Sequence, residues 1–176
     1  MRIFIAVNLP KEVKDYLFDL EKDFKSLGKI NFVPKKNLHI TLKFIGEIKE
    51  DKLNIIKERL KKIKLTSFEV SLDKLEIFPN IESMKVLFVS LAPKEKMQEL
   101  FNNVDGSLIE YPNDYSFSDH ITLGRIKSLK NKENLIKKLN TKIKSIKFKI
   151  NSFELMKSEL SKDGSRYSVL EVYSLE

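Results

Sequence analysis

The same four residues, His-Ile-Thr-Leu, occur twice in this chain of 176 residues, at 39–42 and at 120–123. These are the only two histidines in the sequence, so every histidine is followed by the same three residues. The coincidence indicates an internal duplication, in which each half of the chain supplies one copy of the same local structure. The repeat therefore constrains the fold more than any other feature of the sequence.

Strands and helices are expected in a similar order around the two copies. Apolar residues at helical spacing predict helices at 11–27, 51–65, 93–110 and 132–143. Alternating and apolar runs predict strands at 2–9, 38–45, 68–78, 84–91 and 120–126. A loop follows Glu110, and the segments 146–160 and 165–175, joined by a turn at 161–164, predict a terminal hairpin.

This order favours the α+β class over a doubly wound parallel sheet. No strand is followed by a glycine-rich phosphate loop, and the terminal hairpin is antiparallel. We expect a bilobal, pseudo-symmetric fold with two antiparallel sheets, outer helices and a central cleft that carries both motifs. Residues 1–176 are then a single domain of two similar, intimately packed lobes, with no flexible linker between them.

Composition narrows the chemistry and the partners. The absence of cysteine excludes disulfides and thiolate metal sites, and two histidines leave no conventional zinc site, so we expect no metal and no cofactor. The net charge of +8 favours an anionic partner such as RNA, although many lysines, as in 57–64, fit a solvated helix face equally well. The N-terminal segment resembles neither a signal peptide nor a membrane span, so a cytoplasmic protein without a membrane partner is expected. We also expect it to be a monomer.

Placing each motif on a strand decides which of its side chains meet. Successive side chains of a strand point to opposite faces, so His39 shares a face with Thr41, and His120 shares a face with Thr122. Two imidazoles that face one cleft can act as a base and an acid near neutral pH, while the threonine hydroxyls donate hydrogen bonds to a phosphate. The pattern therefore indicates phosphoester cleavage by acid–base catalysis without a metal. The alternative, two half-buried histidines satisfied within a sheet, fits a single histidine better than a duplicated pair.

These motifs and their flanks resemble the 2H phosphoesterase superfamily, which has two His-x-Thr-x motifs. Within it, the chain is similar to the RNA 2′,3′-cyclic phosphodiesterases once described as bacterial and archaeal 2′-5′ RNA ligases. The resemblance extends to the opening MRIFIAVNLP, the context VPKKNLHITLKFIGE, the IFP at 77–79 and the closing LMKSELSKDGSRYSVLEVYSL. It implies a bilobal fold, His39 as the proton donor to the leaving 3′ oxygen, His120 as the base for water, and a terminal 2′-phosphate as the product. Thr41 and Thr122 would hold the phosphate.

Two further residues are candidates for substrate contacts. Arg125 matches a basic position after the second motif in similar proteins and could bind phosphate, but strict alternation places it on the face opposite His120 unless Gly124 marks a bulge. Phe4 alternates with Ala6 and Asn8 and could stack on a nucleobase, with core packing as the alternative. The expected substrate is RNA with a 2′,3′-cyclic phosphate end, or a cyclic nucleotide. Two other functions remain open: 2′-5′ ligation of RNA ends, and an RNA-end-binding module without turnover.

Overall fold

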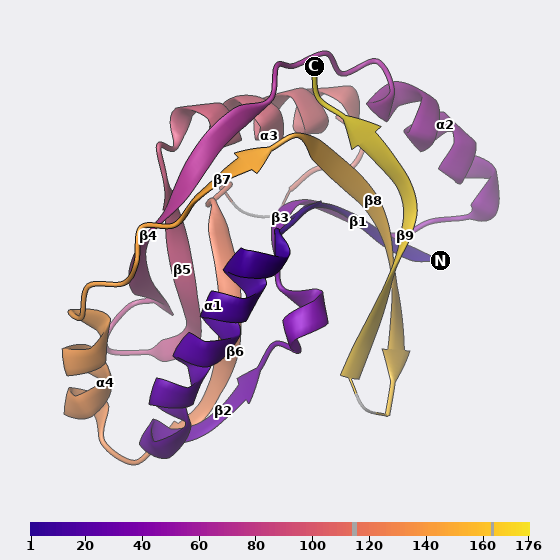
Figure 1. The fold of residues 1–176 in the computed structure, drawn as a ribbon. Helices are drawn as coiled ribbons and strands as arrows, with labels where there is room; N and C mark the ends of the chain where they lie inside the picture. Colours follow the sequence, from indigo (N-terminus) through magenta and orange to yellow (C-terminus); the bar gives the residue numbers. More distant parts are fainter. Residues whose placement is uncertain (114–115, 163) are drawn as a thin grey trace.

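The computed structural model describes residues 1–113, 116–162 and 164–176 (Figure 1). Its strands are β1 (Arg2–Asn8), β2 (Gly28–Phe32), β3 (His39–Glu47), β4 (Phe68–Pro79), β5 (Met84–Ala92), β6 (His120–Leu129), β7 (Lys147–Ile150), β8 (Ser152–Ser161) and β9 (Gly164–Ser174). Its α-helices are α1 (Lys11–Glu21), α2 (Glu50–Leu60), α3 (Glu95–Ser107) and α4 (Lys132–Leu139), and its 3₁₀ helices are η1 (Lys22–Leu27) and η2 (Lys35–Asn37). Among the described residues, no helix is both long enough and apolar enough to cross a membrane.

The strands form an antiparallel sheet in the order β7-β4-β5-β6-β3-β1-β8-β9, with β2 also paired to β6. The two motif strands, β3 and β6, are neighbours at the centre of this order and pair at Ile40 and Ile121. The expected α+β class with antiparallel strands is confirmed. The two expected sheets are joined through this central pair, so one ladder of strands continues across both halves of the chain.

The internal duplication is visible in the order of elements and in the burial of the motif strands. In each half, a strand, a helix, a motif strand and a second helix follow one another: β1-α1-β3-α2 and β5-α3-β6-α4. The first four residues of β3 and of β6 alternate between half-buried and buried positions, the fifth residue of each is buried, and the sixth is exposed. The repeated sequence therefore has the same pattern of burial in both halves.

Helices from each half pack on elements of the other half. The Tyr16 hydroxyl of α1 accepts a hydrogen bond from the backbone amide of Lys144, just after α4, at 2.9 Å. In the other direction, Asp105 of α3 forms an ion pair with Lys43 of β3. In Figure 1, α1 lies beside α4, and α2 lies beside β9. Because the first helix of each half crosses over, the two halves share one continuous hydrophobic core.

Some element boundaries differ from those expected. The helix predicted at 11–27 ends at Glu21 and continues as η1, and the other three helices are shorter than predicted. Strand β2 lies between the helix expected at 11–27 and the strand expected at 38–45, where no element was predicted. A Cβ at Gly28 would lie 2.2 Å from the backbone oxygen of Ser128, so glycine is required for β2 to approach β6. The terminal hairpin is present as β8 and β9, while residues 114–115 of the predicted loop and 163 of the predicted turn lie outside the described residues.

Candidate active site

The two motif strands present their histidines and threonines on the same face of the sheet. Ile40 and Ile121, which pair with each other, are fully buried on the opposite face. In an antiparallel pair, the residues next to this contact lie across from one another, so His39 faces Thr122 and Thr41 faces His120. We call the face that carries these four side chains the histidine face.

Backbone carbonyl groups orient both imidazole rings in the same way. The Nδ1 atom of His39 lies 2.6 Å from the carbonyl oxygen of Asn37, and that of His120 lies 2.7 Å from the carbonyl oxygen of Ser118. A carbonyl oxygen only accepts hydrogen bonds, so Nδ1 carries the proton and donates it in each ring. The Nε2 atom of each ring is therefore the one that can take up a proton. The Nε2 atom of His39 lies 2.9 Å from the Thr41 hydroxyl.

Aromatic rings from neighbouring strands enclose the two histidines. The His39 ring is 5.3 Å from the Phe4 ring and 5.6 Å from the Tyr167 ring, measured between centroids. On the other side, the His120 ring is 5.4 Å from the Phe88 ring. These contacts come from strands distant in sequence, so Tyr167 and Phe88 were not predicted. These aromatic rings restrict the orientation of the imidazoles by packing. Their ring carbons form no hydrogen bonds with the imidazole nitrogens.

Burial lowers the pKa of His39 below its ordinary value, because desolvation disfavours the charged imidazolium. The carbonyl group of Asn37 raises this pKa and the nearby His120 lowers it, both as smaller contributions. The His39 ring is thus biased towards the neutral form as long as no anion lies beside it. An anion placed between the two rings would favour protonation of His39.

A bulge in β6 brings Arg125 onto the histidine face. Thr122 pairs with Phe88 of β5, but Arg125 pairs with Val86, so Leu123 is an additional residue on β6. Residues paired across an antiparallel ladder share a face, and Phe88 and Val86 lie two residues apart on β5. Strict alternation, which places Arg125 on the opposite face, is therefore wrong here. The alternative, a bulge near Gly124, is present.

Phe4 lies beside His39, but its ring is only 3% exposed. A ring that is covered on its faces offers no surface on which a base can stack, so its environment favours the alternative of core packing. The described residues contain no group of three histidine, aspartate or glutamate side chains that could hold a metal ion. A small hollow of about 30 Å³ lies beside His39 and is lined also by Asn8, Glu154 and Tyr167.

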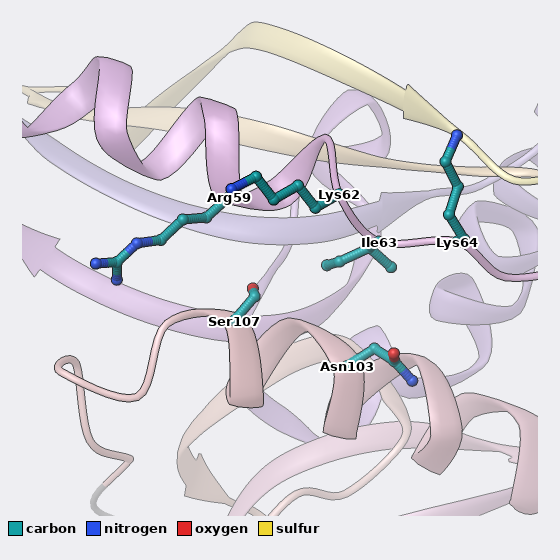
Figure 2. A pocket seen from close by; sticks show the side chains of 6 residues that line it. All are labelled: Arg59, Lys62, Ile63, Lys64, Asn103 and Ser107. Carbon is teal, nitrogen blue, oxygen red and sulfur yellow. The ribbon is translucent and has the colours of Figure 1, made fainter.

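A larger hollow, with a volume of about 500 Å³, lies elsewhere, between α2 and α3. Figure 2 shows the side chains that line it: Arg59, Lys62, Ile63, Lys64, Asn103 and Ser107. It contains neither histidine, and its Arg59 already forms an ion pair with Glu110. The size of a hollow is therefore a poor guide to the chemistry of this protein, and the convergence of two oriented imidazoles is a better one.

Comparisons with known proteins agree with this geometry. A family model described as LigT-like phosphoesterase matches residues 7–88. The RNA 2′,3′-cyclic phosphodiesterase of Methanocaldococcus jannaschii is 32% identical to the chain, with 97% of this chain and 98% of that protein covered. The protein of the same name from Archaeoglobus fulgidus is 30% identical, with 98% and 99% covered. The crystal structure of TT0787 of Thermus thermophilus superimposes with a TM-score of 0.87 at 28% identity, covering 99% of this chain and 97% of that one.

The resemblance seen in the sequence is thus confirmed along nearly the whole chain. The family model covers the first motif only, whereas the two full-length relatives span both. On this similarity, the chain belongs to the LigT-like phosphoesterases of the 2H family and is a hydrolase.

Proposed function

We propose that the protein hydrolyses the 2′,3′-cyclic phosphate at the end of an RNA, or of a nucleotide, to a terminal 2′-phosphate without a metal. The observation that carries this proposal is the pair of imidazoles whose Nδ1–H groups are held by the carbonyl oxygens of Asn37 and Ser118. Each ring is left with Nε2 for proton transfer. Two relatives that cover nearly the whole chain carry the name RNA 2′,3′-cyclic phosphodiesterase.

In the proposed reaction each histidine moves one proton. Neutral His120 takes a proton through Nε2 from a water molecule, whose oxygen forms a new bond to phosphorus. The bond between phosphorus and the 3′ oxygen breaks, and protonated His39 gives its Nε2 proton to that leaving oxygen. The products are a 3′ hydroxyl and a 2′-phosphate. All these side chains belong to one chain, so the proposed site needs no second copy of the protein.

Threonine hydroxyls and Arg125 would stabilise the charge of the phosphate. A hydroxyl can donate one hydrogen bond, and donors fixed where charge develops are among the largest contributions to catalysis. Thr41 and Thr122 lie opposite the histidines across the β3–β6 pair. Arg125, on the same face, would supply a cation. The low pKa of His39 is compatible with its role as the acid, because a bound phosphate anion favours the imidazolium.

The test is to incubate the protein with a nucleoside 2′,3′-cyclic phosphate in the presence of EDTA and to identify the monophosphate formed. We expect the 2′-phosphate, with the chelator having no effect. His39→Ala and His120→Ala should each lower kcat by about a hundredfold to ten-thousandfold, and the double variant should be little worse. Lys62→Ala, at the hollow between α2 and α3, serves as the control and should keep full activity.

Substrates with a better leaving group separate the two roles. A cyclic phosphodiester whose leaving oxygen needs no proton should restore activity to His39→Ala far more than to His120→Ala, because only the former lacks the donor. Restoration of the His120 variant instead would reverse the two roles. Tight binding of the cyclic phosphate with no product from the wild-type protein would show a binding module and contradict the proposed hydrolysis.

A further inference from the structure

Asn37 forms hydrogen bonds through both its backbone and its side chain. Its carbonyl oxygen accepts the hydrogen bond from Nδ1 of His39, and its side-chain amide donates a hydrogen bond of 3.1 Å to the carbonyl oxygen of Ser165 in β9. Asn37 is only 8% exposed, whereas Ser118, the corresponding residue before the second motif, is exposed. One residue of η2 therefore connects the ring of His39 to a strand at the far end of the chain.

The hydrogen bond to Ser165 shows that the hairpin of β8 and β9 bends over the histidine face. Ser165 lies beyond the last residue of β8 that pairs with β1. Asn37 lies next to the opposite end of β1, where Asn8 pairs with His39. A straight hairpin would not bring these two ends together, so β8 and β9 curve back across this half of the sheet (Figure 1). The Tyr167 ring of β9 then lies against the His39 ring.

A second hydrogen bond holds η2 from the side of α1. Lys14 donates it through Nζ to the carbonyl oxygen of Lys36, at 3.2 Å. This bond is exposed, so water can replace either partner, whereas the bond from Asn37 to Ser165 is partly buried. A polar group that loses its partner away from water keeps the full cost of desolvation. Of the two bonds, that of Asn37 therefore contributes more to the position of η2.

We propose that Asn37 is a positioning residue for the acid of the proposed reaction. By binding Ser165, its side chain fixes the turn whose carbonyl oxygen holds Nδ1 of His39, and it keeps the Tyr167 ring against the imidazole. This inference rests on the proposed function, in which His39 gives its proton to the leaving 3′ oxygen. Loss of the bond should impair this proton transfer and leave the base, His120, as it is.

The variant Asn37→Leu removes the amide and keeps a side chain of similar size. We expect kcat for a nucleoside 2′,3′-cyclic phosphate to fall by about tenfold to a hundredfold, with little change in KM, because a misplaced catalytic group slows the reaction. The loss should nearly vanish for a cyclic phosphodiester whose leaving oxygen needs no proton, since that substrate does not use the acid. Asn103→Leu is the matched control and should keep the wild-type kcat, because the Asn103 amide also donates to a backbone carbonyl group, that of Glu99, outside the site.

The dependence of kcat/KM on pH gives a readout that a general loss of stability would not change. The hydrogen bond to the carbonyl group of Asn37 raises the pKa of His39, because it favours the imidazolium. Displacement of this group should lower that pKa, so activity should be lost at a lower pH as the acid deprotonates. The substitution leaves the other titratable groups around His39 in place: Lys14, Lys36, His120, Glu154 and Tyr167.

Four results would overturn the positioning role of Asn37. These are an unchanged kcat in Asn37→Leu, an equal loss of kcat for the two substrates, the same loss in Asn103→Leu, or a limb of His39 that stays at the wild-type pH or moves higher.

A wild-type protein that hydrolyses no cyclic phosphate would contradict the proposed function instead. The role of Asn37 is then tested by NMR titration of the His39 ring in His120→Ala, where it is the only histidine. Adding Asn37→Leu should lower the midpoint of this titration, and an unchanged midpoint would show that the Asn37 side chain does not position the ring.

Discussion

The two histidines have the same neighbours in sequence but different neighbours in space. His39 contacts the rings of both Phe4 and Tyr167, whereas His120 contacts Phe88. The greater enclosure of His39 lowers its pKa, since an imidazolium loses more hydration there. An internal duplication thus supplies two copies of one group, and the rings that enclose the two copies differ in number and in identity.

This difference predicts how the activity depends on pH. If His39 is the acid, activity falls as pH rises through its pKa, and burial places that pKa below its ordinary value in the free protein. A bound phosphate anion stabilises the imidazolium, so the pKa of His39 should be higher in the complex. We expect the limb that depends on His39 to lie at higher pH in the profile of kcat than in the profile of kcat/KM.

The His39 limb is identified with a second substrate, because coupled imidazoles can exchange their apparent pKa values. It is the limb that disappears when the leaving oxygen needs no proton. Measurement of both profiles with the ordinary cyclic nucleotide then checks the direction of the shift. A limb at the same pH in both profiles, or at lower pH in that of kcat, would show that the phosphate does not interact with His39.

The repeat predicts part of the site from sequence alone, and the reason lies in the periodicity of strands. That His39 and Thr41 share one face follows from alternation. The position of Arg125 does not, because a bulge shifts the alternation by one residue. Nor does that of Tyr167, because it reaches His39 only through the pairing of β8 with β1 and β9.

At the scale of elements, β3 and β6 each contain a bulge, and the residue after the bulge contacts a different element in each strand. The position after Leu123 is Gly124, where a Cβ would lie 2.8 Å from the Ile30 side chain of β2. The position after Leu42 is Lys43, which is fully buried and forms an ion pair with Asp105 of α3. At this position β6 therefore packs against strand β2, whereas β3 forms an ion pair with helix α3.

The ion pair of Lys43 predicts a large loss of stability when its carboxylate is removed. Asp105→Ala leaves a buried ammonium group without its partner, and should lower the free energy of unfolding by about 2–3 kcal/mol, because an uncompensated buried charge is costly. Asp19→Ala breaks the exposed pair with Lys22 and is the control, with an expected effect below about 1 kcal/mol. Denaturant unfolding of both variants measures the difference.

A second variant separates the loss of charge from the loss of packing. Adding Lys43→Met to Asp105→Ala removes the unpaired ammonium group and should recover much of the stability, since an apolar side chain of similar length fills the same space. If the double variant is less stable than Asp105→Ala, the lysine stabilises the protein through contacts other than its charge. Equal effects of Asp105→Ala and Asp19→Ala would show that the pair contributes little.

Sequence patterns locate the long elements better than the short ones. The strands of the motifs and the terminal hairpin follow from alternation, whereas β2 has only five residues and its partner β6 lies far along the chain. Nothing local distinguishes such a segment from a loop. Helix ends were predicted too far along the chain, because apolar residues such as Phe24 and Leu27 keep their burial in a 3₁₀ helix.

At the scale of the whole molecule, the first helix of each half contacts elements of the other half. A polar contact joins a helix of each half to the other half, and the buried apolar residues of both halves belong to one hydrophobic cluster. The sequence predicted two similar halves but not this exchange, because hydrophobic periodicity shows which face of a helix is buried and not which sheet covers it. The pairing of Ile40 with Ile121 then fixes the two histidines relative to each other.

The net charge of +8 also belongs to the whole molecule, and it predicts how binding of RNA responds to salt. Each phosphate of a single strand that contacts a cationic surface releases counterions, so the logarithm of the affinity falls with the logarithm of the salt concentration by about 0.7 for each contact. A cyclic mononucleotide has one phosphate, which lies between the histidines in the proposed complex. An oligonucleotide with the same cyclic end adds further phosphates. We therefore expect its KM to rise with salt much more steeply than that of the mononucleotide. Steady-state kinetics over a series of salt concentrations checks this, and equal slopes for the two substrates would mean that the excess lysines form solvated helix faces and take no part in binding RNA.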